Sequence, residues 1–271
     1  MQRIFLLSLF FCLIVITPSS HAKDRTGWQQ ILPNNSNALT LKQLAERHAL
    51  LFDHFVKHSL RGKGKKAFNK MSSKVAINIR WLNKTNTNDY NEAFKRSYPF
   101  VSTYTDWQGM PDSIFLLAYM ESQWQGKSGN KAADYGYWQV VPEVLSELKT
   151  LPYLPKKIRK GNINTIRESE LLSTQAAQAH LHRYHFYFAK VAQYPETDAW
   201  LLTFTAFNWG AGNVKRSMEQ VVQEGLPANY SNFYYYLYQL HKKTPDDRSL
   251  RAAVEYVPKL WHLAQLLKEV N

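Results

Sequence analysis

One carboxyl group in this sequence has surroundings suited to acid–base chemistry. Glu121 lies late in a segment predicted to be helical, with Leu117 and Ala118 on the preceding turn and Trp124 about one turn ahead. Apolar neighbours raise the pKa of a carboxyl by desolvating its charged form, and the negative end of the helix dipole acts in the same direction. A carboxyl that stays protonated near neutral pH can donate a proton to a leaving oxygen. On these features alone, a helix-end glutamate exposed to water stands as an equal alternative.

The elements that must position Glu121 are predicted to be helices, because glycine and proline are sparse and apolar residues recur mostly at helical spacing. Pro111 is well placed to open the helix of Glu121, and Gly126 to end it. Other helices are predicted at 40–60, 89–107, 173–193, 197–207, 214–222, 230–241 and 248–270, and a short one from Pro142.

Two segments do not fit this pattern simply. Residues 61–66 alternate glycine with basic residues and are predicted to be a turn or loop. Residues 75–81 alternate apolar with other residues, so they are compatible with a strand or with a helix. The expected fold is all-α, or nearly so.

The N-terminus has the pattern of an export signal. A basic residue precedes an apolar run over residues 4–16, and Ser20-His21-Ala22 has the small-x-small form of a cleavage site. The run is short for a bilayer span, so residues 1–22 are predicted to be a cleaved signal peptide, with an uncleaved inner-membrane anchor as the alternative. Cleavage would remove Cys12, the only cysteine. A periplasmic protein without a disulfide is therefore expected.

The charge of the chain is strongly positive. Lysine and arginine outnumber aspartate and glutamate by 34 to 21, a formal net charge of +13. Such a surface favours anionic polymers. The predicted export argues against nucleic acid, and peptidoglycan with its associated anionic polymers is the exported counterpart.

Motifs of other chemistries are missing from the sequence. Residues 61–66 lack the full phosphate-loop pattern, and neither His-Glu-x-x-His nor Gly-x-Ser-x-Gly occurs. The histidines at 180, 182 and 185 are interpreted as solvated or packed side chains rather than zinc ligands. No metal and no organic cofactor are expected.

Four stretches of the chain carry a family pattern in a fixed order. They are Met110-Pro111 with Ala118-Tyr119-Met120-Glu121-Ser122 and Gly136-Tyr137-Trp138-Gln139-Val140-Val141-Pro142, then Ser173-Thr174-Gln175-Ala176-Ala177, Ala206-Phe207-Asn208-Trp209-Gly210-Ala211-Gly212-Asn213-Val214, and Tyr256-Val257-Pro258-Lys259. Together they resemble the catalytic domain of the soluble lytic transglycosylases, and within that family the branch of membrane-bound lytic murein transglycosylase D. Each motif is weak alone, whereas four in order are specific.

The resemblance implies a domain organisation and a fold. Residues 1–22 are the signal peptide, 23–97 a helical N-terminal region, and 98–270 the catalytic region including C-terminal helices. The implied fold is a lysozyme-like transglycosylase domain with helical extensions at both ends and a groove for glycan.

The resemblance also implies a reaction. Family members cleave the β-1,4 bond between N-acetylmuramic acid and N-acetylglucosamine without adding water, leaving a 1,6-anhydro end. Glu121 matches the family's catalytic glutamate, which protonates the glycosidic oxygen and then accepts the proton of the muramic acid O6 hydroxyl. One carboxyl suffices because the nucleophile belongs to the substrate, unlike in the usual two-carboxylate glycosidases. Asp134 is the nearest second carboxyl in the motif region and is otherwise a loop residue.

The family's substrate-binding positions carry over to Ser122, Gly136, Tyr137, Trp138, Gln139, Phe207, Asn208 and Tyr256. Ser122 is expected to form hydrogen bonds near the site, and Gly136 to admit a close approach of backbone to sugar. Gln139 and Asn208 would present amides to the glycan. Tyr256 would place its hydroxyl near the catalytic carboxyl. The rings at 137 and 138 either stack on sugar or pack in the core.

The sequence departs from the family pattern at a few positions. Asn130 stands where Ser or Thr is usual, and Ala133 with Asp134 interrupts the usual small, glycine-rich approach to the next motif. Phe207 replaces a tyrosine and so loses a hydroxyl. These changes bear on rate and substrate preference more than on fold.

The leading hypothesis is a lytic transglycosylase that acts on peptidoglycan strands. A peripheral association of this enzyme with the membrane or the cell wall is compatible with the hypothesis. A lysozyme-type muramidase and a weakly active or inactive peptidoglycan-binding homologue are the alternatives.

Overall fold

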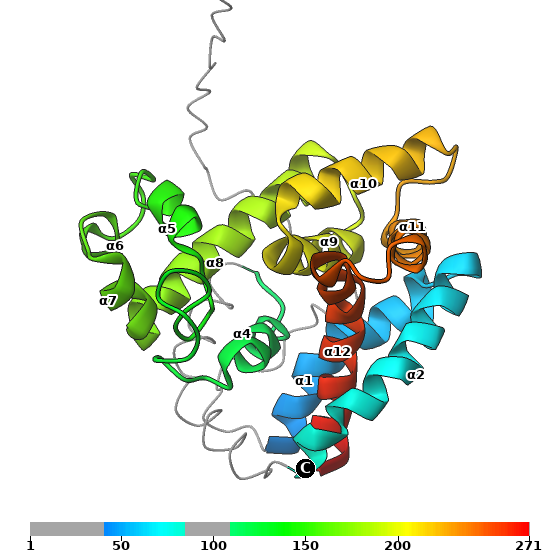
Figure 1. Cartoon of the computed structure of the whole chain (residues 1–271), viewed down its shortest axis with the longest axis horizontal. Coiled ribbons are helices and arrows are strands. Elements are labelled where there is room, and N and C mark those ends of the chain that lie inside the picture. Colours follow the sequence, from blue (N-terminus) through cyan, green and yellow to red (C-terminus); the bar gives the residue numbers. More distant parts are fainter. Residues whose placement is uncertain (1–40, 85–108, 271) are drawn as a thin grey trace, which may run out of the picture.

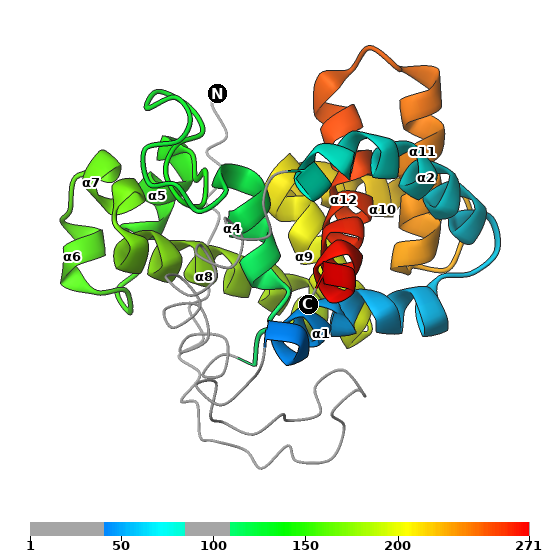
Figure 2. The ribbon, with the colours of Figure 1, turned by 90° about the horizontal axis from the view of Figure 1, so that it is seen from below.

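The computed structural model describes residues 41–84 and 109–270, which form helices joined by loops (Figures 1 and 2). Within these two ranges no strand is formed, and the extended pairing is confined to one isolated bridge between Gly129 and Tyr135. The predicted all-α fold is therefore confirmed. None of the described helices is both long and apolar enough to span a membrane.

The helices follow one another along the chain with short connections. They are α1 (Leu41–His54), α2 (Gly62–Lys84), α4 (Ile114–Ser122), α5 (Pro142–Leu148), α6 (Lys156–Arg159), α7 (Ile163–Glu168), α8 (Glu170–Phe186), α9 (Glu196–Trp209), α10 (Ala211–Gln223), α11 (Tyr230–Lys243) and α12 (Arg248–Val270). Two π-helical segments, η3 (Phe55–Ser59) and η4 (Tyr187–Val191), extend α1 and α8. The helices predicted around these ranges are confirmed to within a few residues, and the one predicted at 89–107 lies outside the described residues.

The start of α2 corrects the sequence analysis. Residues 61–66 are not a loop, because the helix begins within them, and residues 75–81 are helical rather than extended. A Cβ on Gly64 would lie 2.2 Å from the carbonyl oxygen of Ser231 in α11, so this glycine permits close helix packing. The Ser231 hydroxyl accepts a hydrogen bond from the Arg61 amide at 3.1 Å and donates one to the Arg61 carbonyl at 2.9 Å. Glycine at this position therefore serves a helix contact and not a turn.

Helices from the two ends of the chain share one hydrophobic core. α12 packs against α1, α2, α9 and α4, and Figure 1 shows it between α4 and α2. Within this core the ring of Phe55 meets Phe68 and Tyr230 edge to face, at centroid distances of 5.6 and 5.3 Å. The arrangement brings the C-terminal helix against the helix of the candidate catalytic carboxyl.

α4 is a central helix that is apolar almost all round, and its residues from Ile114 to Tyr119 are buried. It ends at Ser122, before the predicted stop at Gly126, because Gln123 and Trp124 adopt left-handed backbone angles with φ of 51° and 58°. Left-handed backbone in residues with a Cβ persists where the surroundings hold it. Here the Trp124 indole is fully buried.

The N-terminal end of α4 also differs slightly from the prediction. Pro111 does not stand in the first turn of the helix but in the turn before it, where its carbonyl accepts a hydrogen bond from the Ile114 amide at 3.1 Å. As a result α4 is short, and Glu121 is its penultimate residue.

Candidate active site

Glu121 lies where two helices distant in sequence meet. Its side chain is half-buried, while the neighbouring Leu117, Ala118 and Trp124 are fully buried. From α12, the Tyr256 hydroxyl donates a hydrogen bond to Glu121 Oε1 at 2.7 Å. The structure thus brings together the two groups that the family pattern pairs, and the Glu121 side chain is not fully exposed to water.

The environment of Glu121 favours a protonated acid. Burial raises the pKa of its carboxyl to about 7, and the charge of Asp134 acts in the same direction. The hydrogen bond from Tyr256 and the charge of Lys259 lower the pKa by favouring the carboxylate. Burial also raises the pKa of Tyr256 well above its usual value, so its phenol remains a donor. A pKa near neutrality makes both the acid and the base form of Glu121 accessible, as a group that donates and then accepts a proton requires.

A charged pair on α12 lies beside this hydrogen bond and was missed by the sequence analysis. The Glu255 side chain is buried, and Lys259 Nζ lies 2.8 Å from its Oε2. Lys259 follows Tyr256 by three residues and so shares its side of the helix. The pair holds an ammonium group where its charge acts on Glu121. The spacing of Glu255 and Lys259, four residues apart, is the signal that could have revealed it.

The polar groups of Ser122 and Gln139 shape the loop that follows α4. The Ser122 hydroxyl donates to the Tyr137 carbonyl at 2.7 Å. The Gln139 side-chain amide donates to the carbonyls of Ser128 at 3.0 Å and Gly136 at 2.7 Å. These donors were predicted to serve the glycan, whereas here they are engaged within the protein and fix the backbone next to Glu121.

Gly136 and Trp138 take positions inside the protein. Gly136 has a φ of +85°, and a Cβ on it would lie 2.2 Å from the carbonyl oxygen of Arg167. The close approach at Gly136 is therefore to the backbone of α7 and not to a sugar. Trp138 is 1% exposed, and its indole N–H donates to the Thr174 hydroxyl at 3.0 Å. Its ring thus packs in the core and does not lie at the surface, where it could stack on a sugar.

The remaining predicted positions lie nearer the surface. Tyr137 is half-buried, with its ring 5.2 Å from that of Trp124. At the end of α9, Phe207 is half-buried and Asn208 is exposed. The Phe207 ring meets Trp138 edge on at 6.4 Å, which joins the end of α9 to the loop after α4. Tyr137 and Asn208 therefore retain surface that a glycan can reach.

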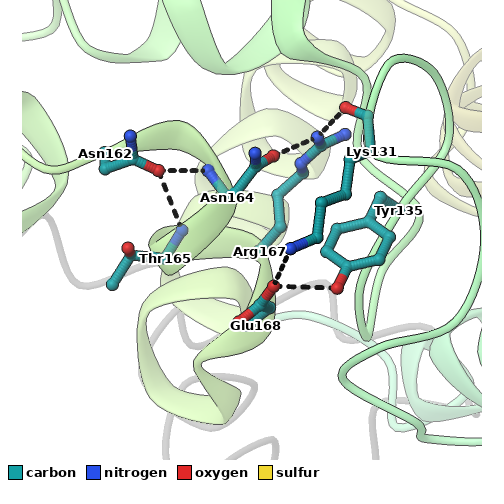
Figure 3. Close-up of polar contacts among 7 residues, drawn as sticks. All are labelled: Lys131, Tyr135, Asn162, Asn164, Thr165, Arg167 and Glu168. Carbon is teal, nitrogen blue, oxygen red and sulfur yellow. Dashed lines mark hydrogen bonds and ion pairs between the residues drawn. The ribbon is translucent and has the colours of Figure 1, made fainter.

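Arg167 is a second residue that the sequence analysis missed (Figure 3). Its side chain is 1% exposed, and its guanidinium donates to the carbonyls of Ala133 at 2.6 Å and Val140 at 3.2 Å, and to that of Lys131. It also donates to Asn164 Oδ1 at 2.6 Å. One side chain from α7 therefore ties together three points of the loop after α4.

A polar cluster around Arg167 supports this link (Figure 3). Glu168 accepts a hydrogen bond from the Tyr135 hydroxyl at 2.8 Å and lies 3.2 Å from Lys131 Nζ. Asn162 caps α7 by accepting hydrogen bonds from two backbone amides of its first turn. The partners of Arg167 are mainly backbone carbonyls, which any sequence supplies, so no side-chain pattern distinguishes it from nearby basic residues.

The positions that depart from the family pattern lie in the same loop. The Asn130 side chain accepts a hydrogen bond from the Ala132 amide at 2.9 Å, and the Asn130 amide donates to the Asp134 carbonyl at 2.8 Å. Asn130 therefore closes a local turn. Asp134 is an exposed loop residue whose charge acts on Glu121.

Of the three histidines of α8, His180 and His185 are packed and His182 is exposed. His180 is buried, which lowers its pKa to about 4, and the His185 ring stacks on Trp200 at 3.9 Å. Across the described ranges, no group of three or more His, Cys, Asp or Glu side chains is suited to hold a metal ion.

Replacement of Tyr256 by phenylalanine should move the pH profile of activity upward. The variant lacks the hydrogen bond that favours the Glu121 carboxylate, so the pKa of Glu121 should rise above about 7. The alkaline limb of kcat/KM on soluble peptidoglycan fragments then shifts to higher pH. Phe233→Leu serves as the control for general destabilisation. It changes a buried core side chain of α11 that forms no hydrogen bond with Glu121. An alkaline limb that stays in place would show that Tyr256 does not tune the acid.

The described residues form an all-helical domain with a desolvated carboxyl at a helix end, a group suited to acid–base cleavage of a glycosidic bond. Residues 100–225 match the family model of the transglycosylase SLT domain, whose fold is lysozyme-like and all-α. This match supports an enzyme of the lytic transglycosylase type acting on peptidoglycan. No curated protein matches the chain. Tyr256 and α12 lie beyond the matched residues.

Proposed function

We propose that the protein is a lytic transglycosylase that cleaves the β-1,4 bond between N-acetylmuramic acid and N-acetylglucosamine and leaves 1,6-anhydro ends. The observation that carries the proposal is Glu121, a carboxyl with its pKa raised to about 7 and a tyrosine hydroxyl on one oxygen, inside an SLT domain. Glu121 is the proposed catalytic residue. Tyr256 and Lys259 are positioning residues, which act by lowering the pKa of Glu121.

The proposed reaction uses Glu121 twice. Its protonated carboxyl donates a proton to the glycosidic oxygen as the bond from this oxygen to C1 of the muramic acid breaks. The carboxylate then takes the proton of the muramic acid O6 hydroxyl, and O6 forms the new bond to C1. No water is consumed, and Glu121 ends protonated. Burial favours the starting acid, while the Tyr256 hydroxyl and the Lys259 charge stabilise the carboxylate formed in between.

Product mass tests this proposal. Soluble fragments released from purified sacculi should be lighter by one water than the products of hydrolysis. Fragments with reducing ends would favour the lysozyme-type muramidase, whose usual mechanism needs a second carboxyl. Asp134 is the candidate for that role, so Asp134→Asn should leave a transglycosylase active and impair a hydrolase. Binding of sacculi without release would favour the non-catalytic homologue.

Introduction of a hydroxyl at Phe207 should raise turnover. The family pattern has tyrosine here, and the half-buried ring leaves part of its surface accessible. One added hydrogen bond to substrate or carboxyl contributes about 0.5–1.5 kcal/mol, so Phe207→Tyr should increase kcat by roughly two- to tenfold with similar KM. Phe207→Met keeps the position apolar and should not increase it. An unchanged or lower rate in the tyrosine variant would show that the site has adapted to phenylalanine.

We also propose that residues 1–22 direct export to the periplasm and that the mature chain begins at Lys23. The supporting observation is the apolar run followed by the small-x-small sequence. N-terminal sequencing of the protein from a periplasmic fraction tests this, and an intact leader on washed membranes would indicate an anchor instead. The boundaries at 23–97 and 98–270 and the likeness to the transglycosylase D branch remain predictions.

A further inference from the structure

α2 carries a row of lysines along one side. Lys63, Lys66, Lys70 and Lys74 are spaced by three or four residues, so they follow a single stripe of the helix, and all four are exposed. The opposite side of α2 is buried against α11 and α12. No aspartate or glutamate occurs in α2. These four residues are named the lysine row.

The charges of the lysine row are little compensated. Among the described residues, Lys74 alone of the four lies within 4.0 Å of a carboxylate, that of Glu255 at 3.8 Å. Lys63 Nζ lies 5.5 Å over the ring of Tyr235. Like charges one turn apart destabilise a helix, and positive charge in its first turn opposes the helix dipole. The lysine row therefore costs stability, which points to a use other than folding.

The row lies apart from the candidate active site. In Figure 1, α12 stands between α2 and α4, and in both Figure 1 and Figure 2 α6 lies on the far side of α4 from α2. α2 packs on α11 and α12 with its other face. A glycan bound at Glu121 would therefore not extend along the lysine row, and a separate partner is needed to explain it.

We propose that the lysine row docks the protein on an anionic phospholipid surface. Lys63 and Lys74 are eleven residues apart in one helix, about 16 Å, so a flat charged surface can meet the whole row at once. Lysine ammonium groups are compact, hydrated charges that suit headgroup phosphates without bidentate geometry. A glycan site would call for a concave, aromatic-lined surface, whereas Asn69 and Ser73 complete this face. Docking here leaves α4 turned away from the membrane.

Vesicle partitioning of the full chain tests the proposal. The quantity measured is the ratio of its partition coefficients for vesicles of mixed phosphatidylglycerol and phosphatidylcholine and for vesicles of phosphatidylcholine alone. Any contribution of the apolar N-terminal run cancels in this ratio. Each lysine near an anionic surface contributes about fivefold, from about 1 kcal/mol per charge. Lys66→Gln with Lys70→Gln should lower the ratio roughly 25-fold, and arginine at both positions should preserve it.

The control variant is Lys156→Gln with Lys157→Gln. These exposed lysines of α6 give the same change in net charge on the opposite side of the molecule. The ratio should change by less than about twofold, because these charges lie beyond a Debye length of about 10 Å from a membrane that contacts α2. Equal losses in both double variants, or no loss in either, would overturn the proposal.

Two further readouts separate this inference from the proposed function. Glu121→Gln should leave the vesicle ratio unchanged, and the Lys66 and Lys70 double variant should digest sacculi at the wild-type rate. At matched salt, its binding to duplex DNA or to sacculi should fall no more than that of the Lys156 and Lys157 control variant. A loss confined to either polymer, with an unchanged vesicle ratio, would contradict a membrane partner.

Discussion

Replacement of Glu121 by glutamine is expected to lower release of anhydro-muropeptides from sacculi by about 10²–10⁴-fold, the usual contribution of general acid–base assistance. Glutamine keeps the size of the side chain but can neither supply nor retrieve a proton. The loss should appear in kcat, with glycan binding largely retained. Mass spectrometry of the soluble products measures the release, and circular dichroism with sacculus pull-down confirms fold and binding.

The pH dependence of the wild type gives a second measure of the same group. The reaction starts from the protonated acid, and the pKa of Glu121 is raised to about 7. Activity should therefore fall as the pH rises through about 7, and the residual activity of the glutamine variant should lack this limb. Substantial anhydro product from the folded variant would overturn the mechanism.

The stability of the same variant has a predictable sign. Because the pKa of Glu121 is raised on folding, the folded state favours its neutral form, and this stabilisation is lost as the pH rises through about 7. A neutral glutamine avoids that loss, so its free energy of unfolding at pH 8 should equal or exceed that of the wild type. A gain in stability with a loss of rate is the pattern expected of a functional residue. A water-exposed glutamate would show neither change.

The raised pKa of the Glu121 carboxyl could be predicted from sequence because the burial that causes it is largely local. Leu117, Ala118 and Trp124 are close to Glu121 along the chain, so the desolvation that raises its pKa follows from neighbours that the sequence displays. Tyr256 could be placed only through its family motif, since the contact spans 135 residues of chain. The helical class likewise followed from apolar spacing.

What could not be predicted depends on contacts across the fold. Gly64 suggested a turn, yet it lies in a helix because α11 packs against it closely. Trp138 stands beside the motif glutamine, but its ring faces the core, and sequence does not reveal which way an aromatic side chain turns. Gln139 and Ser122 were predicted to bind the substrate, whereas their side chains donate hydrogen bonds to backbone carbonyls of the loop.

Arg167 is the residue on which this scaffold depends most, and Arg167→Met should impair both stability and rate. Methionine keeps much of the bulk but leaves the carbonyls of Lys131, Ala133 and Val140 without their charged donor. Loss of hydrogen bonds from a charged group costs about 1.5–3 kcal/mol each, although water will satisfy some of these carbonyls. A net loss of about 3 kcal/mol in the free energy of unfolding is expected, measured by chemical denaturation.

The rate should fall even in the fully folded variant. The loop that Arg167 ties down contains Tyr137, whose carbonyl accepts the hydrogen bond from Ser122 beside Glu121. A shift of about 1 Å in such a support can cost 10²-fold in rate. We therefore expect kcat at 15 °C to drop by roughly 10²-fold for Arg167→Met. The kcat of Arg167→Lys should lie between those of the wild type and Arg167→Met, since one ammonium cannot span three carbonyls.

A purely stabilising role would give a different result. Arg167→Met would then unfold at lower denaturant concentration but turn over at the wild-type rate while folded, with an unshifted pH profile. Arg159→Met on the neighbouring α6 is the matched control, because this arginine is exposed and its side chain donates to the single Leu154 carbonyl at 3.0 Å. Full activity in folded Arg167→Met would mean that the loop holds its shape without the guanidinium and that Arg167 does not position the site.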